Sequence, residues 1–132
     1  MADLEVNLVA ADRAVWSGKA SFVRAKTADG DIGIYPGHQP VLSVLKPSVA
    51  MIKTRAQDGS DGQTLLVALH GGYISVDNDR ISLLSEAAEL SDEIDGERAA
   101  EALARAQAGE YGQDSEAAAV RAQLRLTAIG RG

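Results

Sequence analysis

The chain of 132 residues contains no cysteine, so disulfide frameworks and thiol chemistry are excluded. Aromatic residues make up only 4% of it, so a core must be filled by Val, Leu, Ile and Ala. No run of about 18 apolar residues occurs, and no basic region followed by an apolar stretch opens the chain. These absences predict a protein that neither spans a membrane nor carries a recognisable secretory signal.

Acidic residues outnumber basic ones, 19 against 13, for a net charge of −6. This balance argues against nucleic acid or an anionic bilayer as the main partner, because both are negatively charged. The two histidines, His38 and His70, lie in separate segments, and neither has a serine or aspartate neighbour in a recognisable motif. We therefore predict no catalytic site and no metal site, since two histidines without cysteines rarely bind a metal.

Two functional classes remain open from the residues alone. A free-standing β-sandwich ligand-binding module, for carbohydrate for example, would need exposed aromatic rings, and one Trp, three Tyr and one Phe offer few. An independent hydrolase would use paired carboxylates such as Asp29 and Asp31. Turnover of the purified protein on a broad substrate panel would identify the hydrolase.

The first half of the chain alternates polar and apolar residues, most regularly from Asp3 to Leu8. Many short strands separated by turn clusters, at a spacing of about 8–12 residues, indicate an antiparallel β-sandwich or barrel. A parallel sheet is not expected, because no long crossover helix fits between the strands. Further strands are expected at Ala14–Ser17, Ser21–Thr27, Val41–Leu45, Val49–Arg55, Thr64–His70, Tyr73–Val76 and Ile81–Leu84.

The segment Gly30–Val41 contains three glycines and two of the three prolines. Ile32 and Ile34 alternate with polar or small residues, which predicts a brief strand. Pro36 and the glycine that follows it then predict a tight turn, because proline fixes φ and glycine accepts a positive φ. A rigid, exposed bend of this kind is more useful for docking to a partner than for catalysis.

The composition changes at about Ser85. Ten alanines lie between Ala99 and Ala122, a segment without proline, which favours helix. We expect a first helix over Asp92–Ala108, with Asp92 as the N-cap and acidic residues in the first turns. Gly109 and Gly112 end it, and a second helix runs from Asp114 or Ser115 to about Ala128. The sequence thus predicts an α+β chain, with an antiparallel β-sandwich at residues 1–85 and a two-helix hairpin at residues 86–132.

The apolar stripes of both helices are mostly alanine, with Val120, Leu124 and Ala128 in the second. Alanine buries little area, and short helices are marginal on their own. The hairpin is therefore expected to be weakly attached to the sandwich, either as a mobile switch or as an ordinary appendage that never moves.

The two helices contain four arginines that lie in pairs on shared faces: Arg98 with Arg105, and Arg121 with Arg125. In an antiparallel hairpin all four could converge, and guanidinium forks suit phosphate oxygens. The alternative is pairing within the first helix, which would join Asp95 to Arg98 and Glu101 to Arg105.

Four stretches resemble, in order, the epsilon subunit family of bacterial F-type ATP synthases, called delta in mitochondria. They are Gly30–Val41, the Gly-Gly stretch Leu69–Val76, the Ile-Asp-x-x-Arg-Ala motif within Glu93–Ala99, and Ala122–Arg125. Together they extend over nearly the whole chain. The resemblance implies a regulatory ATP site, with no cofactor required, formed by Glu89, Ile94, Asp95, Arg98, Arg105, Arg121 and Arg125.

The resemblance also implies a non-catalytic rotor subunit of the central stalk, peripheral on the cytoplasmic face of the plasma membrane. The sandwich would bind the gamma subunit and the c-ring, coupling proton flow to ATP synthesis. Asp31 would face the c-ring loops, and His38 would adjoin gamma. The hairpin, when extended, would reach the alpha/beta head and inhibit ATP hydrolysis.

Overall fold

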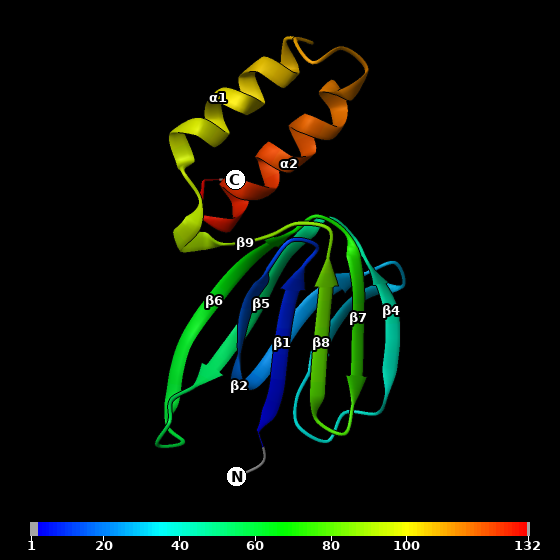
Figure 1. Ribbon diagram of the computed structural model, residues 1–132, viewed down its shortest axis with the longest axis vertical. Helices are drawn as coiled ribbons and strands as arrows, with labels where there is room; N and C mark the ends of the chain where they lie inside the picture. The colour runs from blue at the N-terminus through cyan, green and yellow to red at the C-terminus, as the bar shows by residue number, and fades with distance from the viewer. Residues whose placement is uncertain (1–2, 132) are drawn as a thin grey trace.

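The computed structural model describes residues 3–131, and it shows an N-terminal β-sandwich with a two-helix hairpin standing at one end (Figure 1). The α+β fold class predicted from the sequence is confirmed. The strands are β1 Leu4–Ala10, β2 Ala14–Thr27, β3 Gly30–Ile34, β4 Val41–Leu45, β5 Ser48–Arg55, β6 Asp61–Leu69, β7 Gly72–Asp77, β8 Arg80–Ser85 and β9 Ala88–Leu90. The helical segments are η1 Ser91–Glu93, α1 Gly96–Gln107, η2 Gly112–Asp114 and α2 Ser115–Ala128.

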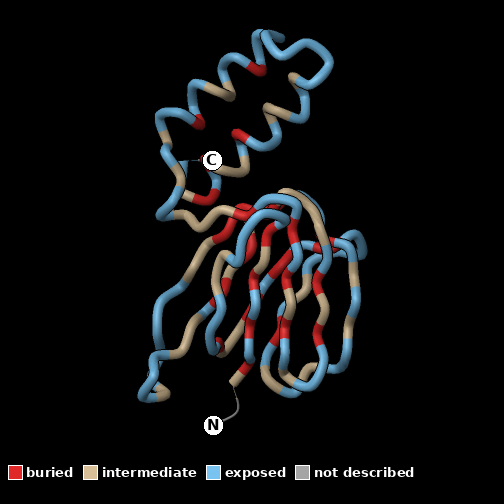
Figure 2. Tube along the Cα trace, in the orientation of Figure 1, coloured by how far each residue is buried: buried red, intermediate tan, exposed pale blue. Residues whose placement is uncertain are grey.

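The strands follow one another around the sandwich in the order β1-β8-β7-β4-β2-β5-β6-β9, with β3 paired to β2. Strand β1 also pairs with the first part of β2, so it has a neighbour on both sides. Figure 2 shows buried residues alternating with exposed or half-buried ones along the strands, and these buried residues form the core. Strand β1 is typical, because its residues alternate between buried and exposed or half-buried.

Two features of the strands differ from the prediction. The expected strands Ala14–Ser17 and Ser21–Thr27 are one strand, β2, because Gly18 and Lys19 continue the pairing with β1, and a register shift between Ala20 and Phe22 redirects the strand toward β5. The strands are not all antiparallel as expected, since β1 and β8 are parallel. The connection between them is the rest of the sandwich rather than a helix. The other strand pairs are antiparallel.

Gly72 allows β7 and β8 to approach closely. It has φ of +126°, and a Cβ added there would lie 1.8 Å from the carbonyl oxygen of Leu84. Its neighbour Gly71 also has positive φ, +88°, but a Cβ there would meet nothing within 4 Å. Only glycine therefore fits at position 72, for two independent reasons.

The start of the first helix differs from the prediction. Asp92 lies in the short helix η1, Ile94 and Asp95 are extended, and α1 begins at Gly96. The N-cap is Asp95, whose Oδ1 accepts hydrogen bonds from the backbone N–H groups of Glu97 and Arg98. The predicted break between the helices is present, since Gly109 and Gly112 both have positive φ. None of the helices in residues 3–131 is long and apolar enough to cross a membrane.

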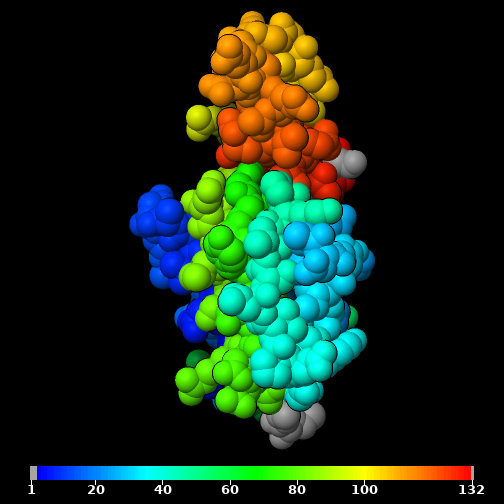
Figure 3. All heavy atoms as spheres, turned by 90° about the vertical axis from the view of Figure 1, so that its right-hand side faces the viewer, coloured from blue at the N-terminus to red at the C-terminus, as the bar shows by residue number. Residues whose placement is uncertain are grey.

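The hairpin is packed with small residues. Its buried side chains are Ala99 and Ala106 of α1, and Ala122, Leu126 and Ala128 of α2. Val120, expected in the apolar stripe of α2, is instead 46% exposed, because the buried face runs through Ala122 and Leu126. Figure 3 shows the hairpin as a separate lobe beyond the end of the sandwich. The contacts between the two parts are therefore made at one end of each.

Candidate functional site

A charged cavity of about 340 Å³ lies at the base of the hairpin. Four of the seven residues of the expected ATP site line it: Glu89, Asp95, Arg98 and Arg125. They come from β9, from the N-cap and first turn of α1, and from α2, so the hairpin fold brings together residues up to 36 positions apart. Glu93 also lines the cavity, so three carboxylates face two arginines, and the guanidinium groups that could bind an anion are partly neutralised there.

A second cavity, of about 410 Å³, adjoins the first along the groove between the helices. Arg121 lines it together with Arg125 and Ala102, which line both cavities. Tyr111 and Asp114 complete its outer part. Three of the four arginines in α1 and α2 therefore line adjoining cavities in this groove.

The remaining two residues of the expected site lie apart from these cavities. Arg105 forms ion pairs with Glu101, at 2.6 Å, and with Glu110, at 3.8 Å. The predicted pairing of Glu101 with Arg105 within the helix is thus confirmed. Ile94 is half-buried in the linker and lines neither cavity. Asp95 and Arg98 form the other pair expected within the first helix. The hydrogen bond between them runs from the backbone N–H of Arg98 to the side chain of Asp95, which caps the helix.

Sequence reasoning missed the partners of Glu89. Its Oε1 accepts a hydrogen bond from Arg125 Nε at 2.6 Å and lies 3.2 Å from Nε2 of His70. His70 follows β6 and its side chain is only 7% exposed. Burial lowers the pKa of His70 below its ordinary value, and the charges of Arg125 and Arg121 lower it further, while Glu89 opposes them. Nothing in the sequence around His70 pointed to this contact, which spans 19 residues.

A second ion pair holds the linker between the sandwich and the hairpin. Arg13, in the turn between β1 and β2, donates two hydrogen bonds to the carboxylate of Glu93, at 2.9 and 3.0 Å. One of its nitrogens also reaches the carbonyl oxygen of Ala88 at 3.3 Å. The Arg13 hydrogen bonds, and a further one from the backbone N–H of Leu90, lower the pKa of Glu93 below its ordinary value. The pair fixes η1 to the sandwich.

The two residues expected at partner contacts lie at opposite ends of β3. Asp31 is exposed next to the turn between β2 and β3, 3.5 Å from Arg24. His38 is half-buried in the loop after β3, where its Nδ1 lies 2.7 Å from the carbonyl oxygen of Gln39. The same loop is tied to the turn between β7 and β8, because Gly37 N–H donates to Asp79 at 2.7 Å.

An apolar stripe crosses the outer face of the sandwich. Val44, Tyr73 and Leu84 lie opposite one another on β4, β7 and β8, and they are 49%, 55% and 49% exposed. Leu42 extends the stripe along β4 with 77% of its surface exposed, and Val9 continues it onto β1. Figure 3 looks onto the side of the sandwich where β4 and β7 lie. A shallow hollow of about 420 Å³ runs along the stripe. The sequence carries a signal for this stripe in adjacent apolar residues such as Leu83 and Leu84. Neighbouring residues of a strand point to opposite faces of the sheet, so one of the two lies on the outer face.

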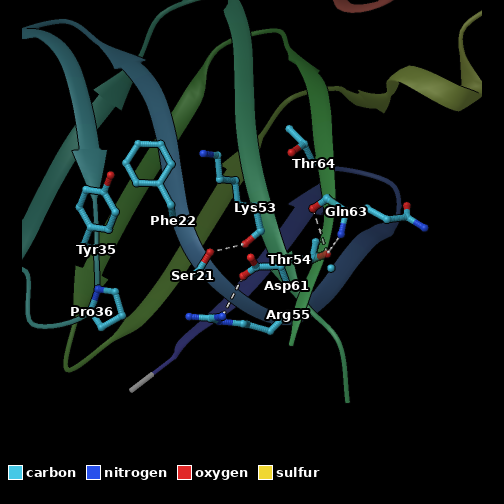
Figure 4. A pocket seen from close by; sticks show the side chains of 11 residues that line it. Ser21, Phe22, Tyr35, Pro36, Lys53, Thr54, Arg55, Asp61, Gln63 and Thr64 are labelled. Atoms are coloured by element: carbon cyan, nitrogen blue, oxygen red, sulfur yellow. Dashed lines mark hydrogen bonds and ion pairs between the residues drawn. The ribbon is translucent and has the colours of Figure 1, made fainter. Parts of the chain in front are cut away.

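Another hollow, of about 480 Å³, lies on the outer face of β2 and β5 (Figure 4). The rings of Phe22 and Tyr35 lie beside each other there, with centroids 4.6 Å apart, and Lys53 Nζ is 5.8 Å from the centroid of Phe22. Across the hollow, Arg55 is paired with Asp61 at 3.0 Å. Its polar groups are thus engaged with one another, and its lining includes no nucleophile paired with a base.

Comparisons with known proteins agree on one family. A family model described as "ATP synthase, Delta/Epsilon chain, beta-sandwich domain" matches residues 3–91. The ATP synthase epsilon chain of Streptomyces griseus is 52% identical over 129 residues, which are 97% of this chain and 96% of the relative. That of Rhodococcus jostii is 42% identical over 131 residues, 99% of each chain. The epsilon chain of Micrococcus luteus is 44% identical over 92 residues, which are 96% of that relative but only 70% of this chain.

Solved structures show the same fold at low sequence identity. A chain in the structure of the Euglena gracilis mitochondrial ATP synthase, OSCP/F1/c-ring in rotational state 1, has a TM-score of 0.69 and 21% identity, over 99% of this chain and 79% of that one. A chain in the central stalk/c-ring structure of the Tetrahymena thermophila mitochondrial ATP synthase has a TM-score of 0.57 and 20% identity, over 96% of each. With the family model and the relatives, these findings establish that the chain belongs to the ATP synthase delta/epsilon chain family.

Proposed function

We propose that this chain is a non-catalytic subunit of the F-type ATP synthase central stalk, in which the sandwich attaches to the rotor and the hairpin regulates ATP hydrolysis. The observation that carries the proposal is the near-full-length similarity to epsilon chains, at 52% identity over 97% of the chain. The two-part architecture supports the proposal. The hairpin buries mostly alanine, so it should open at a lower free energy than the β-sandwich.

The apolar stripe is the proposed contact with the gamma subunit. Contiguous apolar side chains on an exposed sheet face are unfavourable in water unless a partner covers them. Tyr73 lies in the middle of the stripe, with Val44 on one side and Leu84 on the other. Central aromatic residues of this kind dominate the binding energy of many interfaces. His38 lies four residues before Leu42, which supports its assignment to the same partner.

Asp31 is the proposed contact with the c-ring. Its carboxylate is half exposed and its pairing with Arg24 is long, at 3.5 Å, so it is available to a basic loop. An exposed charge at the rim of an interface mainly sets orientation and association rate. With these partners the chain would be peripheral, on the cytoplasmic face of the plasma membrane.

The hairpin is the proposed regulatory part, which in an extended form would meet the alpha/beta head and obstruct hydrolysis. ATP is the proposed effector, bound in the groove lined by Arg98, Arg121 and Arg125. ATP shifts the hairpin only by the difference between its affinities for the docked and extended forms. Titration of the isolated chain with MgATP, followed by arginine side-chain NMR signals, tests the site, and no change at millimolar ATP would contradict it.

Assembly is tested by purification of the ATP synthase from membranes that express tagged variants of this chain. We expect the wild-type chain to recover gamma, alpha, beta and c subunits. Tyr73→Glu should lose most of the recovered gamma, because it places a charge in the middle of the stripe. Val120→Glu, at an exposed position of α2 that lines neither cavity, is the control and should assemble normally. Recovery of gamma with Tyr73→Glu equal to the wild type would refute the stripe as the gamma contact.

A further inference from the structure

One carboxylate oxygen makes polar contacts with both the hairpin and the sandwich, at the place where α2 packs against β5 and β6. Oε1 of Glu89, on β9, lies 2.6 Å from Nε of Arg125 on α2 and 3.2 Å from Nε2 of His70 at the end of β6. The side chains of Glu89 and Arg125 are 27% and 31% exposed, and that of His70 is 7% exposed. The contact is thus partly shielded from water, where an ion pair contributes more than at the surface.

The protonation state of His70 follows from its partners. A carboxylate oxygen can only accept, so Nε2 of His70 carries the hydrogen that is donated to Glu89. Nδ1 is buried and has no hydrogen-bond partner among residues 3–131. A second proton on Nδ1 would be buried without an acceptor, and it would be repelled by Arg125 and Arg121. The docked hairpin therefore holds His70 in its neutral form.

We propose that His70, Glu89 and Arg125 form a proton-sensitive latch, which holds the hairpin against the sandwich and releases it on acidification. When α2 moves away, it removes both arginines and opens the ring of His70 to water. The imidazole can then take a proton and become the positive partner of Glu89 in place of Arg125. Protonated His70 and Arg125 of the hairpin thus compete for the carboxylate of Glu89.

The direction of the pH effect follows from linkage. The pKa of His70 is lowered in the docked form and is about 6.5 when the ring is free. Docking is therefore fully favoured above about pH 6.5 and weakens as the pH falls below it. For one proton, the ratio of docked to released hairpin should fall by up to about tenfold between pH 7.5 and 5.5.

The linker provides a hinge that the proton does not disturb. Arg13 and Glu93 hold η1 to the sandwich through two hydrogen bonds that involve no residue of α1 or α2. Ile94 and Asp95 follow in extended conformation, before α1 begins. Release is therefore expected to turn the hairpin about residues 94–95 while η1 stays in place. The consequence for hydrolysis rests on the regulatory role proposed above, whereas the latch itself can be tested in the isolated chain.

The test uses pairs of spin labels, because the absence of native cysteine makes introduced cysteines unique. Gln57→Cys in the sandwich and Gln113→Cys at the tip of the hairpin report their separation by pulsed electron resonance. We expect the ratio of the longer, released distances to the docked distance to rise by up to about tenfold from pH 7.5 to 5.5. The same pair in an Arg125→Lys chain, which loses the Nε contact, should start with more released hairpin and show the same pH response.

His70→Gln is the matched variant, because its amide can still donate to Glu89 but does not titrate. It should remove the pH response in both backgrounds. NMR titration of the two imidazoles gives a second measurement that does not depend on how much hairpin is released: His70 should titrate below about 6.5 and shift upward in Arg125→Ala. An unchanged pH response in His70→Gln, or an ordinary pKa for His70 in the docked chain, would overturn the latch. Either result would leave assembly with gamma, tested through Tyr73, unaffected.

Discussion

Substitution of Gly72 by alanine should destabilise the sandwich far more than the same substitution at Gly71. At position 72 the new methyl group would lie 1.8 Å from the carbonyl oxygen of Leu84 and 2.7 Å from Cα of Ser85, both backbone atoms of β8. The strands must therefore separate by more than an ångström to accommodate it. At position 71 nothing lies within 4 Å, so the methyl group meets open space.

The magnitude follows from two contributions. A non-glycine residue held at positive φ costs about 1–3 kcal/mol, and this applies at both positions. At Gly72 the separation of β7 from β8 also weakens ladder hydrogen bonds, at about 0.5–1.5 kcal/mol for each one. We therefore expect a loss of about 3–5 kcal/mol for Gly72→Ala and about 1–3 kcal/mol for Gly71→Ala. The first is a large share of the stability of a typical domain, about 5–15 kcal/mol.

Urea unfolding of the full chain measures both losses, with the fluorescence of Trp16, the single tryptophan, reporting on the sandwich. With a slope of about 1–3 kcal/mol per molar urea, Gly72→Ala should lower the midpoint by about 1–5 M and Gly71→Ala by about 0.3–3 M. The slope is common to both variants, so the shift should be larger for Gly72→Ala. Equal midpoints for the two variants, or a Gly72→Ala midpoint equal to the wild type, would refute the argument that the close approach of β8 requires glycine.

Two further predictions concern the linker and the first helix. Asp95→Ala should reduce the stability of α1 by about 1 kcal/mol, because it removes the side chain that accepts two backbone N–H groups, whereas Asp92→Ala should have little effect. Hydrogen exchange of the α1 amides measures both effects. A larger effect of Asp92→Ala would contradict the assigned cap. The Arg13–Glu93 pair lowers the pKa of Glu93, so its contribution to stability should be present above about pH 4.3 and be lost as the pH falls through the lowered value. The difference in unfolding midpoint between the wild type and Glu93→Gln should accordingly shrink on acidification, and a difference that grows would reverse the sign of this reasoning.

The sequence predicted the two-part fold because both signals are local. The alternation of residues 3–8 and the alanines of residues 99–122 each depend on neighbours within a few positions. The parallel pairing of β1 with β8 could not be predicted in this way, because it joins residues about 75 positions apart. The N-cap was misassigned to Asp92 for a related reason, since Asp92 and Asp95 are equally good caps and the extended conformation of Ile94 decides between them.

The candidate site, like the fold, was predictable from the sequence only where the signal is local. The spacing of Arg121 and Arg125 on one helix face was evident from the sequence, and both arginines line the groove. Arg105 satisfied the same rule of spacing, yet it is turned toward Glu101 and Glu110. The contact of His70 with Glu89 depends on how β6 and β9 pair, so no local pattern could reveal it. Tertiary contacts decide which of several equivalent polar residues are brought together.

The double pairing of β1 determines when the chain can fold during its synthesis. Strand β1 leaves the ribosome first, but its parallel neighbour β8 emerges only after residues 80–85 have been added. Until then the growing polypeptide exposes one unpaired flank of β1, together with core side chains such as Leu8 that β8 will cover. The pairing of β1 therefore cannot be completed before residues 80–85 have been made, and the hairpin follows those residues in the chain.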